Sequence, residues 1–189
     1  MIIRKATQVG SPLIRAKAKK VSDPKTKETK EVIQNLIDSM RHHELVGMAA
    51  PQIGSELRIF VTEIRETTLR KGDSQANTDS LRVFINPRII SCSRKQSKGW
   101  EGCGSVASAN LFGKVMRPVS LKIEALNEKG EKFQLEAKNL LARVIQHEID
   151  HLNGIVFTDK ADTKTYMSRE EYLKLRAKKK VHTKKASKS

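Results

Sequence analysis

The sequence predicts an α+β fold. Mixed or antiparallel β-sheets pack around a central helix that carries the pattern His-Glu-x-x-His, with one further helix near each end of the chain. Two observations predict this. Short runs rich in Val, Ile, Leu and Phe lie between residues 57 and 137, separated by turn residues. Segments with apolar residues three or four positions apart lie on both sides of that region. The chain of 189 residues is long enough for one domain with a core.

The helices are predicted from apolar spacing and from capping residues. The first covers residues 29–42, with apolar side chains at Val32, Ile33, Leu36, Ile37 and Met40. Asn139 is the expected N-cap of a second helix that runs to about Asn153, and Gly154 follows as the glycine beyond its end. The last helix covers Ser168 to about Lys180, because Ser168 and Glu171 are spaced as a capping box.

The strands are predicted between these helices. Residues 57–64 form one strand, and a polar stretch from 65 to 80 follows it as a long loop. Residues 83–86 and 89–93 are short strands on either side of Pro87. Residues 119–126 and 132–137 pair as a hairpin around Glu128-Lys129-Gly130. We therefore expect a domain over residues 1–165, followed by a C-terminal helix and Lys-rich tail over residues 166–189.

The charge of the chain is strongly positive. It contains 37 Lys and Arg against 21 Asp and Glu, a formal net charge of +16. Such a field favours a polyanionic partner, most often nucleic acid. The last sixteen residues, Lys174–Ser189, contain eight Lys or Arg and no acid. A solvated, frayed end is the simplest interpretation of this tail, and contact with RNA is the functional one.

Cysteine content and hydropathy indicate the cellular compartment in which the protein is expected. Only Cys92 and Cys103 are present, which does not suggest a disulfide scaffold and favours a reducing compartment. Cys92 is expected to be a thiol without a partner at the end of a strand. No apolar run approaches the roughly 20 residues that span a bilayer, so we expect no membrane association. A bacterial cytoplasm is the expected location, although the basic, acid-free N-terminus leaves an organelle of bacterial ancestry open.

His147 and His151 lie on the predicted helix 139–153. Four residues at 100° each place them about 40° apart, one turn along the same face, so that two imidazoles can bind one metal ion. Glu148 lies about 100° round from His147, next to such a site, where it can take the proton of a water bound to the ion. A buried helix whose histidines bond to backbone carbonyls fits the same pattern. A catalytic site needs a third protein ligand and an open position.

The third ligand is not obvious downstream. Zinc proteases with a third histidine have it six residues after the second, where this chain has Phe157. Other zinc proteases use a downstream acid as the third ligand. The candidates in this chain are Glu170 and Glu171, which look like residues on the surface of a helix. Cys103, between Gly102 and Gly104, is the upstream candidate, although a single cysteine is usually a small core residue. Gln52, in the stretch GMAAPQIG, adds a neutral hydrogen-bond donor.

Taken together and in this order, three segments resemble the peptide deformylase family. Its signatures are a GxGxAAPQ loop, an EGCxS turn and a QHExDH helix. Here they stand as LVGMAAPQ over residues 45–52, EGCGS over 101–105 and QHEIDH over 146–151. The resemblance runs from near Ile3 to about Lys160.

The resemblance implies a metal-dependent hydrolase that removes the formyl group from the N-terminal formylmethionine of nascent polypeptides. Cys103, His147 and His151 bind one divalent ion, Fe²⁺ in cells, with Ni²⁺, Co²⁺ or Zn²⁺ also accepted, which suits thiolate and imidazole ligands. Glu148 acts as the general base and acid. The Gln52 amide and the backbone N–H of Gly104 meet the charge on the formyl oxygen. The products are formate and a free methionyl N-terminus.

The resemblance also implies where the peptide lies. Its backbone pairs with the segment around Val46 and Gly47, and the methionine pocket is formed by Val46, Leu140 and Val144. Arg143 and Glu101 lie near this region by the family's pattern. Docking at the ribosome, through Lys178, Lys179, Lys180, Lys184 and Lys185, is the implied role of the tail, and we expect a monomer.

Two positions depart from the family's pattern. The first glycine of the first motif is Leu45, which would cost about 1–2 kcal/mol if that position needed a positive φ. The residue after the metal cysteine, usually Leu, is Gly104, so a side chain that would wall the site is absent. A catalytically impaired, ribosome-associated binding protein is the alternative that these changes raise. A zinc endopeptidase is a second alternative, which the lack of a downstream ligand disfavours.

Overall fold

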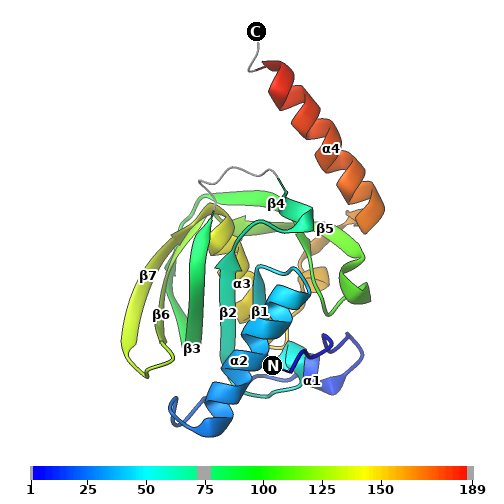
Figure 1. The fold of residues 1–189 in the computed structure, drawn as a ribbon. Coiled ribbons are helices and arrows are strands. Elements are labelled where there is room, and N and C mark those ends of the chain that lie inside the picture. Colours follow the sequence, from blue (N-terminus) through cyan, green and yellow to red (C-terminus); the bar gives the residue numbers. More distant parts are fainter. Residues whose placement is uncertain (1, 72–77, 187–189) are drawn as a thin grey trace.

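The computed structural model describes residues 2–71 and 78–186, with side chains up to Lys178 in the last helix. Its main element is a five-stranded antiparallel sheet in the order β1-β2-β3-β6-β7. These strands are β1 (Gly47–Ala49), β2 (Ile59–Ile64), β3 (Asp79–Cys92), β6 (Ser120–Leu126) and β7 (Lys132–Lys138). A second, three-stranded sheet has the order β4-β5-β8, formed by β4 (Gln96–Gly102), β5 (Leu111–Pro118) and β8 (Ala161–Ser168) (Figure 1).

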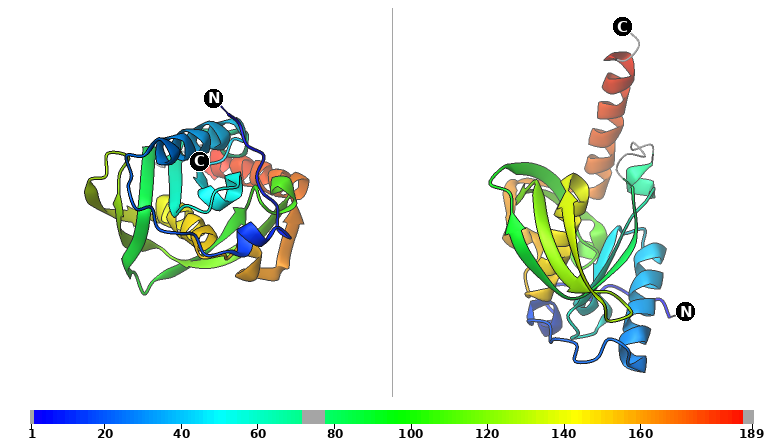
Figure 2. Two further views of the ribbon diagram at one scale, coloured as in Figure 1. Left: turned by 90° about the horizontal axis from the view of Figure 1, so that it is seen from below. Right: turned by 90° about the vertical axis from the view of Figure 1, so that its left-hand side faces the viewer.

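Four α-helices accompany the sheets in the described residues: α1 (Pro12–Arg15), α2 (Lys27–His42), α3 (Asn139–Leu152) and α4 (Arg169–Ala186). Helix α3 contacts β1, β2, β6 and β7 of the larger sheet and β5 of the smaller one, and α2 contacts β1 and β2. Short 3-10 turns are η1 (Ala50–Ile53), η2 (Thr68–Arg70), η4 (Ala107–Ala109) and η5 (Phe157–Asp159). Helix α4 extends away from the body of the molecule (Figures 1 and 2). No helix in the described residues is both long and apolar enough to cross a bilayer.

The core explains why the middle strands are continuously apolar. Phe60 and Phe84 stack at 4.4 Å between ring centroids and face α3, in a cluster with Ile145 and Ile149. Their neighbours along the strands, such as Ile59, pack on the other side against α2. Because side chains alternate along a strand and both faces of this sheet are covered, nearly every position from Ile59 to Ile64 is buried.

The predicted helices are present with adjusted ends. Helix α2 begins at Lys27, because the Thr26 hydroxyl oxygen accepts a hydrogen bond from the Thr29 N–H at 3.1 Å. Helix α3 has Lys138 as its N-cap, so the prediction of Asn139 was wrong. Asn139 is instead the first residue of α3. Its φ is +53°, and its N–H donates to the Val119 carbonyl at 2.8 Å.

The other helix ends and the strand pattern also differ in part. Gly154 follows α3 with a φ of +74°, as expected for a glycine beyond a helix end. Ser168 accepts from the Glu171 N–H at 3.3 Å, but α4 continues beyond Lys180 to Ala186. The two strands predicted around Pro87 are one strand, β3. Its pairing with β6 shifts register between Ile85 and Arg88, which accommodates the missing N–H of the proline.

Strands β1, β4, β5 and β8 were not predicted. The predicted division at residue 165 falls inside β8, whose residues Met167 and Ser168 still pair with β5. Part of the predicted loop 65–80 forms η2 and the start of β3, and residues 72–77 lie outside the described residues.

Candidate metal centre

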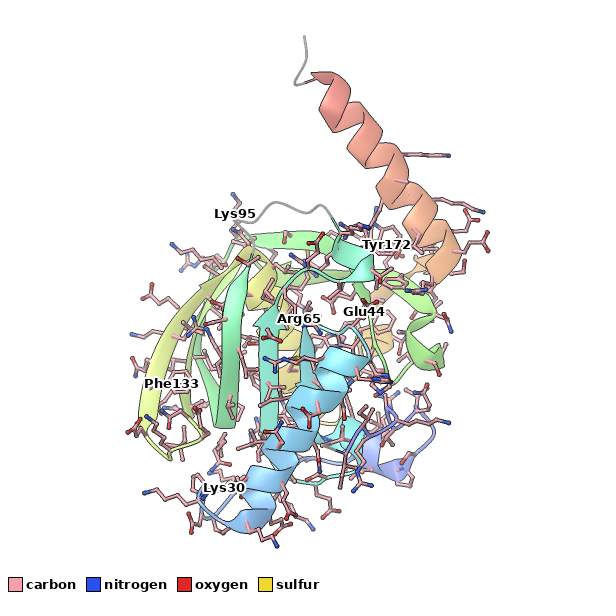
Figure 3. The ribbon with its side chains drawn as sticks, in the orientation of Figure 1. Lys30, Glu44, Arg65, Lys95, Phe133 and Tyr172 are labelled. Carbon is pink, nitrogen blue, oxygen red and sulfur yellow. The ribbon has the colours of Figure 1, made fainter. Side chains whose placement is uncertain are left out.

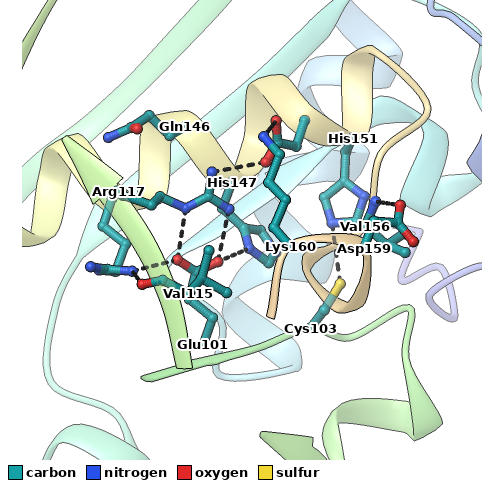
Figure 4. Close-up of polar contacts among 12 residues, drawn as sticks. Glu101, Cys103, Val115, Arg117, Gln146, His147, His151, Val156, Asp159 and Lys160 are labelled. Atoms are coloured by element: carbon teal, nitrogen blue, oxygen red, sulfur yellow. Dashed lines mark hydrogen bonds and ion pairs between the residues drawn. The ribbon is translucent and has the colours of Figure 1, made fainter. Parts of the chain in front are cut away.

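Cys103, His147 and His151 come together between the two sheets. The nitrogen or sulfur atoms that they can offer to a metal ion all lie within 4.8 Å of one another. Cys103 Sγ is 3.1 Å from His151 Nε2, and Cys103 and His151 are 2% and 1% exposed (Figure 4). Ligands of a tetrahedral ion with bonds of about 2.0–2.3 Å lie roughly 3.3–3.8 Å apart. The donor set therefore fits one transition-metal ion.

The protonation of this cluster is set by its own members. Burial by itself would raise the pKa of the Cys103 thiol, but the imidazoles of His151 and His147 outweigh it and lower the pKa well below that of a free thiol. Burial lowers the pKa of His147, while Cys103 and Glu101 outweigh it and hold that pKa well above its usual value. A thiolate is the form that binds a metal, so the thiol is already close to the required state.

Glu101 fixes the orientation of His147. Its Oε2 lies 3.0 Å from His147 Nδ1, which leaves Nε2 directed towards the cluster (Figure 4). Burial raises the pKa of Glu101, but hydrogen bonds from Arg117 and His147 outweigh burial and hold that pKa far below its usual range. A carboxylate bonded to a ligating histidine is a common way to fix its tautomer and ring.

Arg117 connects this carboxylate to helix α3. Its guanidinium donates to both oxygens of Glu101, at 2.7 and 2.9 Å, and to Asp150 at 2.8 Å (Figure 4). The Arg117 side chain is only 3% exposed. Lys160 donates to the other oxygen of Asp150 at 2.6 Å, and Arg143 donates to Glu101 at 2.7 Å. The charges therefore form one connected network behind the histidines.

Glu148 stands on the open side of the cluster. Burial raises the pKa of Glu148 to about 7, although the nearby imidazoles of His147 and His151 oppose this. Neither Glu148 Oε2 nor His151 Nδ1 has a hydrogen-bond partner among the described residues. A Cβ added at Gly47 would lie 2.5 Å from Glu148 Oε1, so a glycine there is required for the close approach of β1 to this carboxylate.

Gln52 lies against the cysteine. Its amide nitrogen is 3.7 Å from Cys103 Sγ and 3.4 Å from Ser105 Oγ. Its Oε1 accepts a hydrogen bond from the Ala49 N–H at 2.8 Å, so the amide nitrogen is the atom that faces Cys103. The side chain is 2% exposed.

The N-terminal segment 6–9 crosses the two loops that carry these groups. The Thr7 N–H donates to the Gln52 carbonyl at 2.7 Å, and the Val9 N–H donates to the Ser105 carbonyl at 2.8 Å. The segment therefore ties both loops to one strand of backbone.

A cleft of about 150 Å³ opens onto the centre. The six residues predicted to bind substrate, Val46, Gly47, Glu101, Leu140, Arg143 and Val144, all line it, together with Gln52, Cys103, Gly104, His147 and Glu148. Leu45, Trp100 and Gly102 also line it, and sequence reasoning did not assign them to the pocket. Arg117 and Asp150 were also missed. Asp150 could have been found inside QHEIDH, whereas Arg117 shows no signal in a strand that was itself not predicted.

A sequence model described as "Polypeptide deformylase" matches residues 3–166. The chain belongs to the peptide deformylase family. The peptide deformylase of Natranaerobius thermophilus is 39% identical over 162 residues, which cover 86% of this chain and 94% of the relative. Peptide deformylase 1 of Clostridium acetobutylicum is 38% identical over 160 residues, covering 85% and 95%.

Solved deformylases share the fold. The Thermotoga maritima peptide deformylase has a TM-score of 0.73 and 30% identity, covering 86% of this chain and 99% of that one. The Met-Ala-Ser-bound class I type b peptide deformylase of Acinetobacter baumannii has a TM-score of 0.74 and 26% identity, covering 85% and 100%. The chain is therefore an enzyme with deformylase activity, and its α+β fold of antiparallel sheets and helices is that of the family.

Proposed function

We propose that deformylation takes place in the cleft beside Cys103, His147 and His151, on the N-terminal formylmethionine of nascent polypeptides. The single observation that carries this is the convergence of one thiol, two imidazoles, a carboxylate and a buried amide donor at one end of an apolar cleft; in the described residues one oxygen of that carboxylate has no hydrogen-bond partner. Formate and a free methionyl N-terminus are the products.

The cluster would hold one divalent ion, with Fe²⁺ as the native metal and Ni²⁺, Co²⁺ or Zn²⁺ as substitutes. Thiolate and imidazole donors suit this group of metals, and one thiolate leaves a formal charge of about +1 on the site. When bound, the ion acidifies water and polarises the formyl carbonyl. The protein supplies the remaining steps.

Glu148 accepts the proton of the attacking water and passes it to the nitrogen of the leaving amine. Its pKa, raised to about 7, is matched to both transfers near neutral pH. The close contact with Gly47 and the burial of Glu148 (3% exposed) keep the carboxylate beside the reacting atoms. Loss of this carboxylate should remove turnover and leave the metal ligands in place.

Gln52 and the backbone N–H of Gly104 donate hydrogen bonds to the formyl oxygen as negative charge develops on it. Removing one such donor typically costs about 3–4 kcal/mol, or 10²–10³ in rate. The Gln52 amide is oriented for this because its oxygen is already bound to the Ala49 N–H.

The peptide backbone pairs with the edge of the larger sheet. Strand β1 is the terminal strand of that sheet, and an extended peptide can add to such an edge. Val46, Leu140 and Val144 line the cleft next to it and offer an apolar pocket for methionine. A structural relative binds Met-Ala-Ser, which is what deformylation of formyl-Met-Ala-Ser leaves, and this supports a formylated peptide as the substrate.

We further propose that the enzyme works as a monomer at the bacterial ribosome in the cytoplasm, with the basic tail on ribosomal RNA. Helix α4 extends from the body, and its described residue Lys178 is exposed. The side chains of Lys179, Lys180, Lys184 and Lys185 lie outside the described residues.

The test is formate release from formyl-Met-Ala-Ser by protein purified without oxygen and loaded with Fe²⁺ or Ni²⁺, beside Glu148→Ala. We expect turnover by the parent chain and a loss of at least about 10²-fold in the variant at equal metal content. Turnover retained in Glu148→Ala would overturn the role of that residue. Metal binding without turnover in the parent would favour a binding protein, and cleavage of unformylated internal peptide bonds would favour an endopeptidase.

A further inference from the structure

Leu45 and Gly104 face each other across the wall of the cleft. A Cβ built on Gly104 would lie 3.2 Å from Leu45 Cδ1 and 3.4 Å from the Cβ of Ala6. Gly104 does not have a positive φ, so its backbone would accept a side chain. The Leu45 side chain occupies space that a side chain at position 104 would need.

The backbone before Leu45 accounts for its position. Helix α2 ends in the two hydrogen bonds of a Schellman motif, from the Leu45 N–H to the Met40 carbonyl at 2.9 Å and from the Glu44 N–H to the Arg41 carbonyl at 3.2 Å. The positive φ, +53°, falls on Glu44, which lies near the end of α2 in Figure 3. Leu45 itself therefore carries no backbone strain, contrary to the cost expected if this position needed a positive φ. Its side chain is held because it packs partly against the core beneath α2.

Leu45 and Gly104 also separate two cavities. Both line the cleft of about 150 Å³ at the metal centre and a neighbouring cavity of about 320 Å³. The neighbouring cavity is otherwise lined by polar or small residues: Lys5, Ala6, Gln8, His43, Ser108 and Ala109. Because Gly104 has no side chain, the apolar part of the partition between the cavities comes from Leu45.

We propose that Leu45 is a substrate-positioning residue of this enzyme, because its side chain supplies the apolar wall that Gly104 lacks. The two departures from the family's pattern are therefore adjacent in space, with a side chain at 45 and none at 104. Leu45 provides the apolar contact that holds the formylated peptide against the metal centre, and it keeps water in the outer cavity away from the reacting carbonyl. The proposal rests on the deformylase activity of the chain.

The test compares four forms of the full chain: the parent, Leu45→Ala, Gly104→Leu and the double variant. All are loaded with the same metal and assayed on formyl-Met-Ala-Ser. Leu45→Ala should raise KM about 10-fold or more, since it removes an apolar contact of several carbons, and should change kcat less. Gly104→Leu should lower kcat/KM about 10-fold, because it overpacks the wall against Leu45. In the double variant, the leucine at 104 fills the vacated space and kcat/KM should return to within about 3-fold of the parent.

Leu57→Ala is the matched control, since Leu57 packs against the same core cluster but does not line the cleft. It should lower the thermal unfolding temperature about as much as Leu45→Ala while KM stays at the parent value. The proposal is overturned if the losses of the two single variants simply multiply in the double variant. It is also overturned if Leu45→Ala leaves KM unchanged. Absence of turnover in the parent would instead contradict the activity itself, so the two failures are distinguishable.

Discussion

At the scale of single residues, Arg117 connects Glu101, which contacts the candidate ligand His147, to Asp150 on helix α3. It lies on β5, is nearly completely buried, and bonds to Glu101 and Asp150 at the same time. Two buried carboxylates around one guanidinium are stable only while the geometry is kept, because an unpaired buried charge is costly. We therefore expect metal affinity and stability to depend on the same side chain.

We expect Arg117→Lys to weaken metal binding about 10–100-fold, as is typical when a group that orients a ligating histidine is lost. Lysine cannot donate to both oxygens of Glu101 and also reach Asp150. Arg117→Ala should lower the free energy of unfolding by about 3–5 kcal/mol, since both acids lose their partner. Chelator competition and thermal unfolding measure the two effects.

The control is Arg88→Ala, which breaks an ion pair with Glu124 on the surface, where the Arg88 side chain is 73% exposed. It should cost at most about 1 kcal/mol and leave metal affinity unchanged. Equal losses in the Arg88 and Arg117 variants would contradict the importance of burial.

At the scale of elements, the N-terminal segment acts as a strap over the reactive loops. Gln8 donates to the Gly104 carbonyl at 2.8 Å, and its Oε1 accepts from the Ser108 N–H at 3.0 Å. The turn that it holds has three successive residues with positive φ, Ala107 to Ala109, at +47°, +50° and +63°. Such conformations cost about 1–2 kcal/mol per residue and need support from their surroundings.

We expect Gln8→Glu to lower kcat about 10-fold with a smaller change in KM, because small displacements of positioned groups are costly in catalysis. The glutamate keeps the acceptor for Ser108 and loses the donor to Gly104, so the N–H of Gly104 is less well fixed. Gln8→Ala should lower kcat similarly and lower the melting temperature further. Wild-type kcat in Gln8→Glu would show that the bond to Gly104 is only structural. Gln34→Glu, on the exposed face of α2, is the matched control.

The attachment of α2 to β2 should give a pH-dependent contribution to stability. Arg41 donates to both oxygens of Glu63 at 2.7 and 2.8 Å, and these bonds lower the pKa of Glu63 below its ordinary value of 4.5. A lowered pKa in the folded state adds stability above pH 4.5, and this stability is lost as the pH falls through the folded-state pKa.

Glu63→Gln should therefore lose about 0.5–1 kcal/mol of unfolding free energy at pH 7, and the difference from the parent should shrink towards pH 3. Denaturant unfolding at several pH values measures it. Glu31→Gln, from an exposed pair on the same helix, should cost less than about 0.5 kcal/mol. A deficit in Glu63→Gln that does not vary with pH would refute the linkage.

The elements that sequence reasoning found are those whose signal is local. Helix α2 and the hairpin of β6 and β7 show apolar periodicity within their own residues. Strands β4 and β5 do not. The first residues of β4, from Gln96 to Lys98, are exposed and show no apolar pattern. In β5 the buried Arg117 interrupts the apolar pattern, because it bonds to partners 16 and 33 residues away in the sequence. The candidate metal ligands could be proposed from the sequence because their motifs are contiguous, whereas the partners behind them are joined only by the fold.

At the scale of the whole molecule, the root of α4 is attached to the wall of the cleft. Tyr172, at the base of the helix (Figure 3), stacks on Phe112 with ring centroids 4.3 Å apart and lies 5.8 Å from Trp100, which lines the cleft. Helix α4 extends away from the body (Figure 2), and the stretch from Lys174 onwards contains basic residues and no acid. The basic part of the tail is thus separable from the part that supports the site.

We expect removal of residues 174–189 to weaken co-sedimentation with ribosomes and to leave kcat/KM on short formylated peptides within about 2-fold, because phosphate contacts act outside the cleft. Binding by the full chain should fall steeply as salt increases. Tyr172→Ala leaves the tail intact. It should preserve co-sedimentation with ribosomes and lower kcat/KM on short formylated peptides. Unchanged ribosome binding after the truncation would exclude the tail as the contact.

The three candidate metal ligands come from two separate parts of the fold. Cys103 follows the last residue of β4 in the smaller sheet, and both histidines lie on α3, which packs against the larger one. A bound ion is therefore a cross-link between chain segments more than forty residues apart, comparable in topology to a disulfide but dependent on the oxidation state of the metal and the thiol. We expect loss of the ion or oxidation of the Cys103 thiol to remove this cross-link together with the reactivity of the centre. Inactivation and loss of stability would then begin with the same event.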